Sequence, residues 1–183
     1  RQVITTVGGA EYTLSCWVKS NTGTDQFFKL YGNGGGASSS QFTATSDWKL
    51  FSHTFTGNGL SATHGLRDDG VNTCDLQVWG AHLYRSDLGG MAPVPGAATG
   101  FEYYVPTNGA AEYLPRVGHH VYNGSTWVNE GLLIESEPRT NLFQHSDFSS
   151  GWDETGVDPI ALDETGPDGQ ANTAVTLNED STA

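Results

Sequence analysis

Two short alternating stretches of the sequence place aromatic and polar residues at matching positions. Trp17 and Lys19 lie in the first stretch, and Gln77 and Trp79 lie in the second. Side chains alternate between the faces of a strand, so all four residues are expected on the face opposite the apolar ones. Indole rings stack on the C–H groups of sugars, while amide and ammonium groups bond hydroxyls. The pattern therefore predicts a carbohydrate-binding face; the alternative is that the tryptophans pack beneath a loop or a neighbouring subunit.

An acidic segment late in the sequence contains the expected metal ligands Asp153, Asp158 and Asp163. Calcium is held by several oxygen atoms from loops, which favours a structural calcium ion here. The spacing does not match an EF-hand, so a solvated acidic loop is the competing interpretation. No serine hydrolase, zinc peptidase or nucleotide-binding motif occurs, and no catalytic residue is predicted. We therefore expect a protein that is not an enzyme.

The charge balance excludes several classes of partner. The net charge is −13, from 8 Lys and Arg against 21 Asp and Glu. A basic patch cannot form from so few cations, so no nucleic acid is expected as a partner. No apolar run approaches the ~18 residues of a membrane span, and no membrane insertion is expected. The chain begins with Arg1 rather than Met, which suggests a fragment or a processed product.

Strand signals dominate the chain, and no helix is predicted. Period-two alternation and β-branched runs indicate strands, and the 24 glycines favour many turns. The expected strands are residues 2–7, 12–19, 27–31, 48–56, 74–83 and 174–177. The fold class is therefore an all-β antiparallel sandwich with a hairpin extension. Its predicted core contains Tyr12, Leu14, Cys16, Val18, Phe51, Phe55, Leu76, Val78 and Leu83. Cys74 shares the parity of that set, so both cysteines are expected as buried apolar groups, with a disulfide as the alternative.

The middle of the chain differs from both ends. Residues 89–112 are rich in Gly, Pro and Ala and lack periodicity, which indicates a linker. Residues 113–140 contain two alternating runs around an Asn-Gly pair at 123–124. Asn-Gly accepts the positive φ angles of a tight hairpin turn. A β-hairpin is therefore predicted between the linker and the last part of the chain.

Three stretches together resemble a known family. Residues 12–19 (YTLSCWVK), 48–56 (WKLFSHTFT) and 78–83 (VWGAHL) occur in this order. In composition and order they resemble strands of the jelly-roll, carbohydrate-binding-module-like domains in bacteriophage tail and fibre proteins. Residues 148–152 (FSSGW) and 167–169 (PDG) resemble the first strand-and-turn region of such a domain. The resemblance implies that the sandwich is a jelly roll.

A junction motif comes after these strands rather than before them. Residues 131–142 contain GLLIE and RTNL, which resemble the segment that precedes such a domain. The family order therefore implies that residues 141–183 supply the early strands and residues 1–88 the later ones. The sequence is then either cut from a repeating array, or residues 141–183 complete the sandwich of the same or a neighbouring chain. The sequence leaves these alternatives open.

The resemblance also implies a function. It predicts a non-enzymatic module of a virion appendage, a tail or head fibre, made in the host cytoplasm. The implied partners are host cell-surface polysaccharide, other virion proteins and further copies of the chain, as a trimer or a repeat array. The implied glycan-binding residues are Trp17, Lys19, Gln77 and Trp79, and the only implied cofactor is structural calcium. The alternative is a purely structural module that links or decorates repeated subunits by strand exchange.

Overall fold

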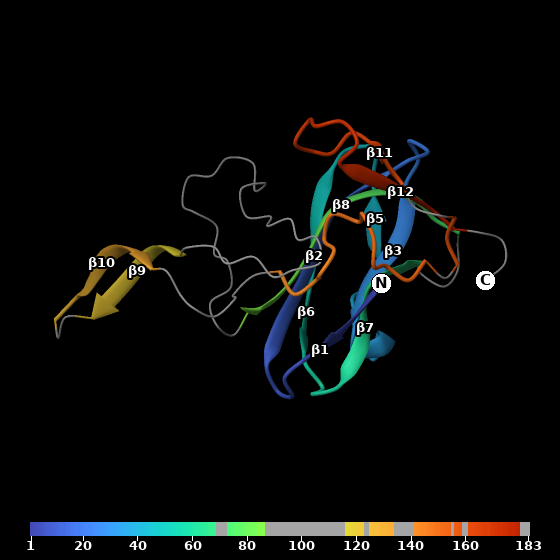
Figure 1. Cartoon of the computed structure of the whole chain (residues 1–183). Coiled ribbons are helices and arrows are strands. Elements are labelled where there is room, and N and C mark those ends of the chain that lie inside the picture. Colours follow the sequence, from blue (N-terminus) through green and yellow to red (C-terminus); the bar gives the residue numbers. More distant parts are fainter. Residues whose placement is uncertain are drawn as a thin grey trace.

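The computed structural model consists of two antiparallel sheets that pack face to face as a β-sandwich, together with a separate two-stranded hairpin (Figure 1). It describes residues 1–68, 73–86, 116–122, 125–133, 141–154, 156–158 and 161–179, with side chains outside 116–122 and 127–133. Over these ranges no α-helix is present, and the 3-10 turn Asn33–Gly35 is a short helical element. None of the described residues forms a helix long and apolar enough to cross a membrane.

The first sheet has the strand order β1-β7-β3-β4, with β5 also paired to β3. Its strands are β1 (Gln2–Thr5), β3 (Gln26–Gly32), β4 (Ala37–Ser38), β5 (Phe42–Ala44) and β7 (Ser61–Asp68). β1 is short and pairs only with residues 61–64 of β7. Residues 65–68 therefore extend beyond the end of β1, and a pocket described below lies beside them.

The second sheet has the order β11-β12-β8-β2-β6. Its strands are β2 (Glu11–Ser20), β6 (Lys49–Thr56), β8 (Asp75–Arg85), β11 (Leu162–Glu164) and β12 (Ala174–Asn178). β12 pairs with β8 in the register Val175 to Val78, so the last part of the chain adds directly to a strand from the first part. In this structure, residues of 141–183 thus complete the sheet of the same chain.

The predicted core is confirmed. Of the nine predicted core residues, eight are buried, and Phe51 is partly buried and packs against them. β2 shows why the alternation works, since Leu14, Cys16 and Val18 are fully buried while Trp17 between them is not. The core also holds residues that the alternation did not indicate: Phe28, Leu30, Phe143, Phe148 and Val175.

The strand predictions are correct for β1, β2, β3, β6, β8 and β12, apart from their ends. The predicted hairpin is also present as β9 (Arg116–Tyr122) and β10 (Trp127–Leu133), which pair only with each other among the described residues. Its Asn-Gly turn and the predicted linker at 89–112 lie outside the described residues. β7 was missed, because its sequence SATHGLRD has no apolar alternation and its pairing partners β1 and β3 are distant in sequence.

The segment after residue 140 is fastened to β8 by its first residues. The buried Asn141 side chain donates from Nδ2 to the Ala81 carbonyl (2.7 Å) and accepts at Oδ1 from the Leu83 amide (2.9 Å). The Leu142 amide donates to the Leu83 carbonyl at 2.6 Å. Phe143 follows and is 1% exposed in the core. We call residues 141–154 and 156–158 the strap, because their contacts lead from β8 to Arg1 and Gln2 at the start of the chain.

The two cysteines are not disulfide-bonded, and they differ in access. Cys16 is fully buried, and burial raises the pKa of its thiol, whereas Cys74 is only half-buried. A thiol must be accessible and ionised to react. We therefore expect a thiol reagent to modify Cys74 in the native chain and to reach Cys16 only after unfolding. Thiol titration of the Cys74→Ser chain with and without urea checks this; fast modification of that chain without urea would contradict it.

Candidate ligand-binding pocket

The four residues predicted to form a carbohydrate-binding face do lie together. In the pairing of β2 with β8, Trp17 is opposite Trp79 and Lys19 is opposite Gln77. All four occupy the outer face of the second sheet, since the adjacent Val18 and Val78 are in the core. The alternation therefore predicted their placement correctly.

Two of these four residues are closed to a ligand. Trp79 is 6% exposed, and a Cβ on Gly166 would lie only 2.9 Å from its Cδ1 atom, so the turn at 166–169 covers the indole. Gln77 is buried too, and its Nε2 donates to Asn21 Oδ1 at 2.8 Å. Lys19 lies 5.2 Å from the ring centroid of Trp48, a cation–π contact. A sugar would therefore find only part of the expected face.

A buried histidine on the same face makes stability depend on pH. Burial lowers the pKa of His82 to about 4, against an ordinary value of 6.5. Between these values the unfolded chain binds the proton and the folded chain does not, so stability falls as pH falls from 6.5 to 4. The loss amounts to roughly 3 kcal/mol for this group. We expect the free energy of unfolding of His82→Gln to fall less between pH 7 and pH 4.5, measured by urea titration. An equal fall in both chains would contradict the expectation.

The three predicted metal ligands are not brought together. Asp153 pairs with Arg1, Asp158 accepts from Asn178 Nδ2 at 3.1 Å, and Asp163 lies exposed in β11. Within the described ranges, no group of three or more His, Cys, Asp or Glu side chains is placed to hold a metal ion. Two of the three carboxylates instead have protein partners that position the strap and β12.

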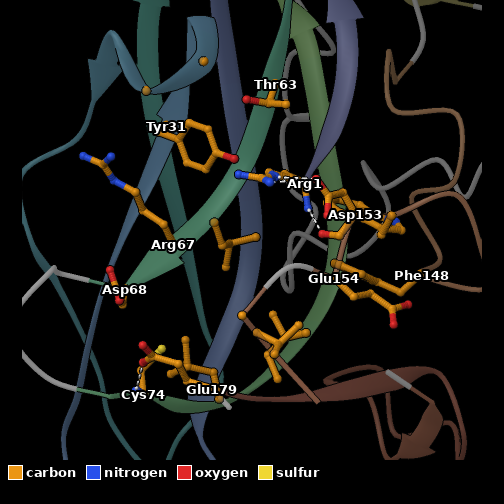
Figure 2. A pocket seen from close by; sticks show the side chains of 18 residues that line it. Arg1, Tyr31, Thr63, Arg67, Asp68, Cys74, Phe148, Asp153, Glu154 and Glu179 are labelled. Carbon is orange, nitrogen blue, oxygen red and sulfur yellow. Dashed lines mark hydrogen bonds and ion pairs between the residues drawn. The ribbon is translucent and has the colours of Figure 1, made fainter. Parts of the chain in front are cut away.

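A cavity of about 280 Å³ opens where the strap passes the exposed end of β7. Figure 2 shows Tyr31 and Arg67 on one side of the pocket, Glu154 and Phe148 on the other, and Arg1 between Tyr31 and its ion-pair partner Asp153. The lining includes apolar residues of both sheets, namely Leu66, Leu76 and Leu177. The pocket therefore lies between the two sheets, next to residues 65–68 of β7, which extend beyond the end of β1.

Contacts to the first two residues of the chain hold the strap in place. Arg1 Nε and Nη2 both lie 2.8 Å from Asp153 Oδ2, and the Asp153 amide donates to the Arg1 carbonyl at 2.9 Å. The bond to Asp153 raises the pKa of the Arg1 guanidinium. The Gln2 side chain donates to the His145 carbonyl and accepts from the Gln144 amide, each at 3.0 Å. The end of the strap is tied to β12, because the Asp158 amide donates to the Asn178 carbonyl. These bonds fix one wall of the pocket.

Stacked aromatic rings form that wall. The ring of Trp152 lies 4.5 Å from that of Phe148 and 5.1 Å from that of Phe143, and its Nε1 donates to the His145 carbonyl. Phe148 adopts a φ of 61°, a left-handed conformation that is uncommon for a residue other than glycine. Such strain persists where packing over-determines it, and here Phe148 is 4% exposed and stacks on Trp152. The wall is thus apolar and rigid.

The opposite side of the pocket combines a cation with an aromatic ring. The Arg67 guanidinium lies 5.7 Å from the ring centroid of Tyr31, and its Nη2 donates to Ser38 Oγ at 2.9 Å. Carboxylates complete the lining: Asp68, Asp153, Glu154 and Glu179. No sequence signal pointed to this site, since its residues come from both ends of the chain and from β3 and β7. The FSSGW motif at 148–152 marked part of the wall, but only as a strand-and-turn region.

No protein-family model, curated protein or solved structure significantly matches this chain. The assignment of function therefore depends on the chemistry of the pocket and on the sequence motifs described above.

Proposed function

We propose that this chain is a non-enzymatic, glycan-binding module of a bacteriophage virion appendage, and that the pocket beside β7 is its binding site. The observation that carries the proposal is the combination of a rigid aromatic wall with a polar rim around one cavity. Sugars present C–H faces and many hydroxyls, and proteins bind them with aromatic faces and hydrogen-bonding side chains. Trp152 supplies the first requirement, and Arg67 and Glu154 supply the second.

The strand order supports the jelly-roll part of this proposal. The short strands β4 and β11 lie at the ends of their sheets, and without them the sheets read β12-β8-β2-β6 and β1-β7-β3-β5. When β12 is counted before β1, these eight strands alternate between the two sheets, except that β3 and β5 follow one another in the same sheet. Jelly rolls are double sheets of eight strands, and lectin domains are among them. The family motifs and this order thus favour the same kind of module.

A glycan array probed with the full chain tests the proposal. We expect the wild type to bind bacterial surface polysaccharides, and Arg67→Ala to bind at least about tenfold more weakly, which is about 1.4 kcal/mol. Trp17→Ala serves as the matched variant on the outer face of the second sheet, and it should bind like the wild type. Loss with Trp17→Ala but not with Arg67→Ala would move the site to that face. No binding by the wild type to any polysaccharide would refute the proposal.

A second proposed function is assembly by strand exchange, favoured by the way residues 141–179 dock. β12 completes the sheet through β8, and Asn141 fastens to the same strand. Because residues 87–140 separate these partners in sequence, a neighbouring copy could supply the docking segment. Such exchange predicts a homo-oligomer, for instance a trimer or an array, whose mass light scattering would measure. A monomer over the micromolar range would exclude exchange between free copies.

A further inference from the structure

The pocket faces more negative than positive groups. Its lining contains four carboxylates, from Asp68, Asp153, Glu154 and Glu179, and two guanidinium groups, from Arg1 and Arg67. The imbalance matches that of the whole chain, whose net charge is −13. Charges of one sign that line a cleft raise the local concentration of ligands of the opposite sign and lower that of like-charged ones. The net charge of the chain therefore disfavours the approach of an acidic ligand, and the charges of the lining disfavour its binding in the pocket.

The Arg1 guanidinium presents no free fork to an anion. Arginine binds carboxylate, phosphate or sulfate groups best through two parallel N–H bonds. Arg1 directs both Nε and Nη2 to Asp153, each at 2.8 Å. Arg67 uses Nη2 on Ser38 and lies over Tyr31. An acidic sugar would therefore meet one arginine with uncommitted N–H groups, Arg67, against the four carboxylates of the lining.

The same groups suit uncharged hydroxyls. A carboxylate accepts hydrogen bonds only, and each sugar hydroxyl can donate one. Glu154 is exposed and can accept from a ligand, and Asp68 lies across the pocket from it, half-buried in the lining (Figure 2). The remaining N–H groups of Arg67 can donate to hydroxyl oxygens. Trp152 and Phe148 both line the pocket and give it an aromatic surface, against which the C–H groups of a pyranose can pack.

We infer that the ligand of this pocket is an uncharged glycan, built of neutral hexose units, rather than a polymer that carries uronate, sialate, phosphate or sulfate groups. This inference rests on the proposed glycan-binding function and narrows it to one chemical class.

Matched pairs of oligosaccharides test the inference with the full chain. Each pair consists of a neutral oligomer and its uronic-acid counterpart, such as oligogalactose and oligogalacturonate, titrated calorimetrically. We expect the neutral member to bind at least about tenfold more tightly, with little change between about 50 and 500 mM salt, since screening acts on charge pairs. An acidic member that binds equally well or better, with an affinity that salt weakens, would overturn the inference and leave glycan binding in place. Binding of no member of any pair would instead overturn the glycan-binding function itself.

A second experiment measures the same pairs of oligosaccharides on a variant that removes one negative charge from the edge of the pocket. In Glu154→Gln an acceptor remains but a negative charge is lost, so the ratio of the affinity for the acidic member to that for the neutral member should rise about threefold. Asp47→Asn is the matched control, because Asp47 is exposed in the loop between β5 and β6 and does not line the pocket. Equal gains in the two variants would show that discrimination comes from the net charge of the chain and not from the pocket, and would overturn the inference as a property of this site.

Discussion

A chain that ends at residue 140 is expected to lose cooperative folding altogether. Without residues 141–183, β8 loses its partner β12, and the core loses Phe143, Phe148 and Val175. Removing one large buried aromatic side chain already costs about 3–5 kcal/mol, and whole domains are stable by only about 5–15 kcal/mol. Near-UV circular dichroism and urea titration of the truncated chain should therefore show no sigmoidal transition.

Adding the missing segment back distinguishes lost packing from failed expression or aggregation. A synthetic peptide of residues 141–183 should bind the truncated chain and restore the near-UV signal and the transition, because all its contacts with β1 and β8 are noncovalent. The expectation would be contradicted if the truncated chain unfolded cooperatively with a free energy of unfolding within about 1 kcal/mol of that of the full chain. The strap and β12 would then not be needed for the fold.

Asn141→Ala is expected to have the largest effect of any single polar substitution in the sandwich, a loss of roughly 2–6 kcal/mol. The side chain is 3% exposed and satisfies two buried backbone groups of β8, the Ala81 carbonyl and the Leu83 amide. Alanine would leave both without a partner, and each unsatisfied buried group costs about 1–3 kcal/mol. Chemical denaturation at pH 7 measures the difference.

Asn178→Ala is the matched control for this substitution. Asn178 is also an asparagine with a side-chain hydrogen bond, to Asp158 Oδ2, but it is exposed. Water can replace that bond, so the loss should stay below about 0.5–1 kcal/mol. Equal losses for the two variants would mean that the Asn141 bonds contribute no more than a surface contact.

The sequence predicted the elements whose stability depends on their own alternation. β2 could be assigned, with its two faces, because Leu14, Cys16 and Val18 alternate with polar or indole side chains. β7 could not be assigned, because its sequence SATHGLRD does not alternate. Its residues are buried because β7 lies between β1 and β3 in the sheet. Period-two patterns report one face buried against a core, and β7 lacks that pattern.

The candidate site could not be predicted for the same physical reason. Arg1 and Asp153 are far apart in sequence, and nothing local to either residue indicates that they form an ion pair at a pocket. Trp79 was placed correctly by parity, yet its exposure depends on the turn at Gly166, which pairing between β11 and β12 brings over it. Parity gives the direction of a side chain but not what lies above it.

The hydrogen bond between the Leu142 amide and the Leu83 carbonyl has a consequence for how this protein can change. β8 ends at Arg85, and Asn141 and Leu142 are bonded to this same strand, so the sandwich is continuous on both sides of the intervening sequence. For a flexible loop between fixed ends, doubling its length costs only about 0.6 kcal/mol. The sequence between these points can therefore lengthen, shorten or be exchanged for another module while the sandwich and its pocket stay intact. A new binding element could therefore be inserted between β8 and the strap without changes to the residues of the core.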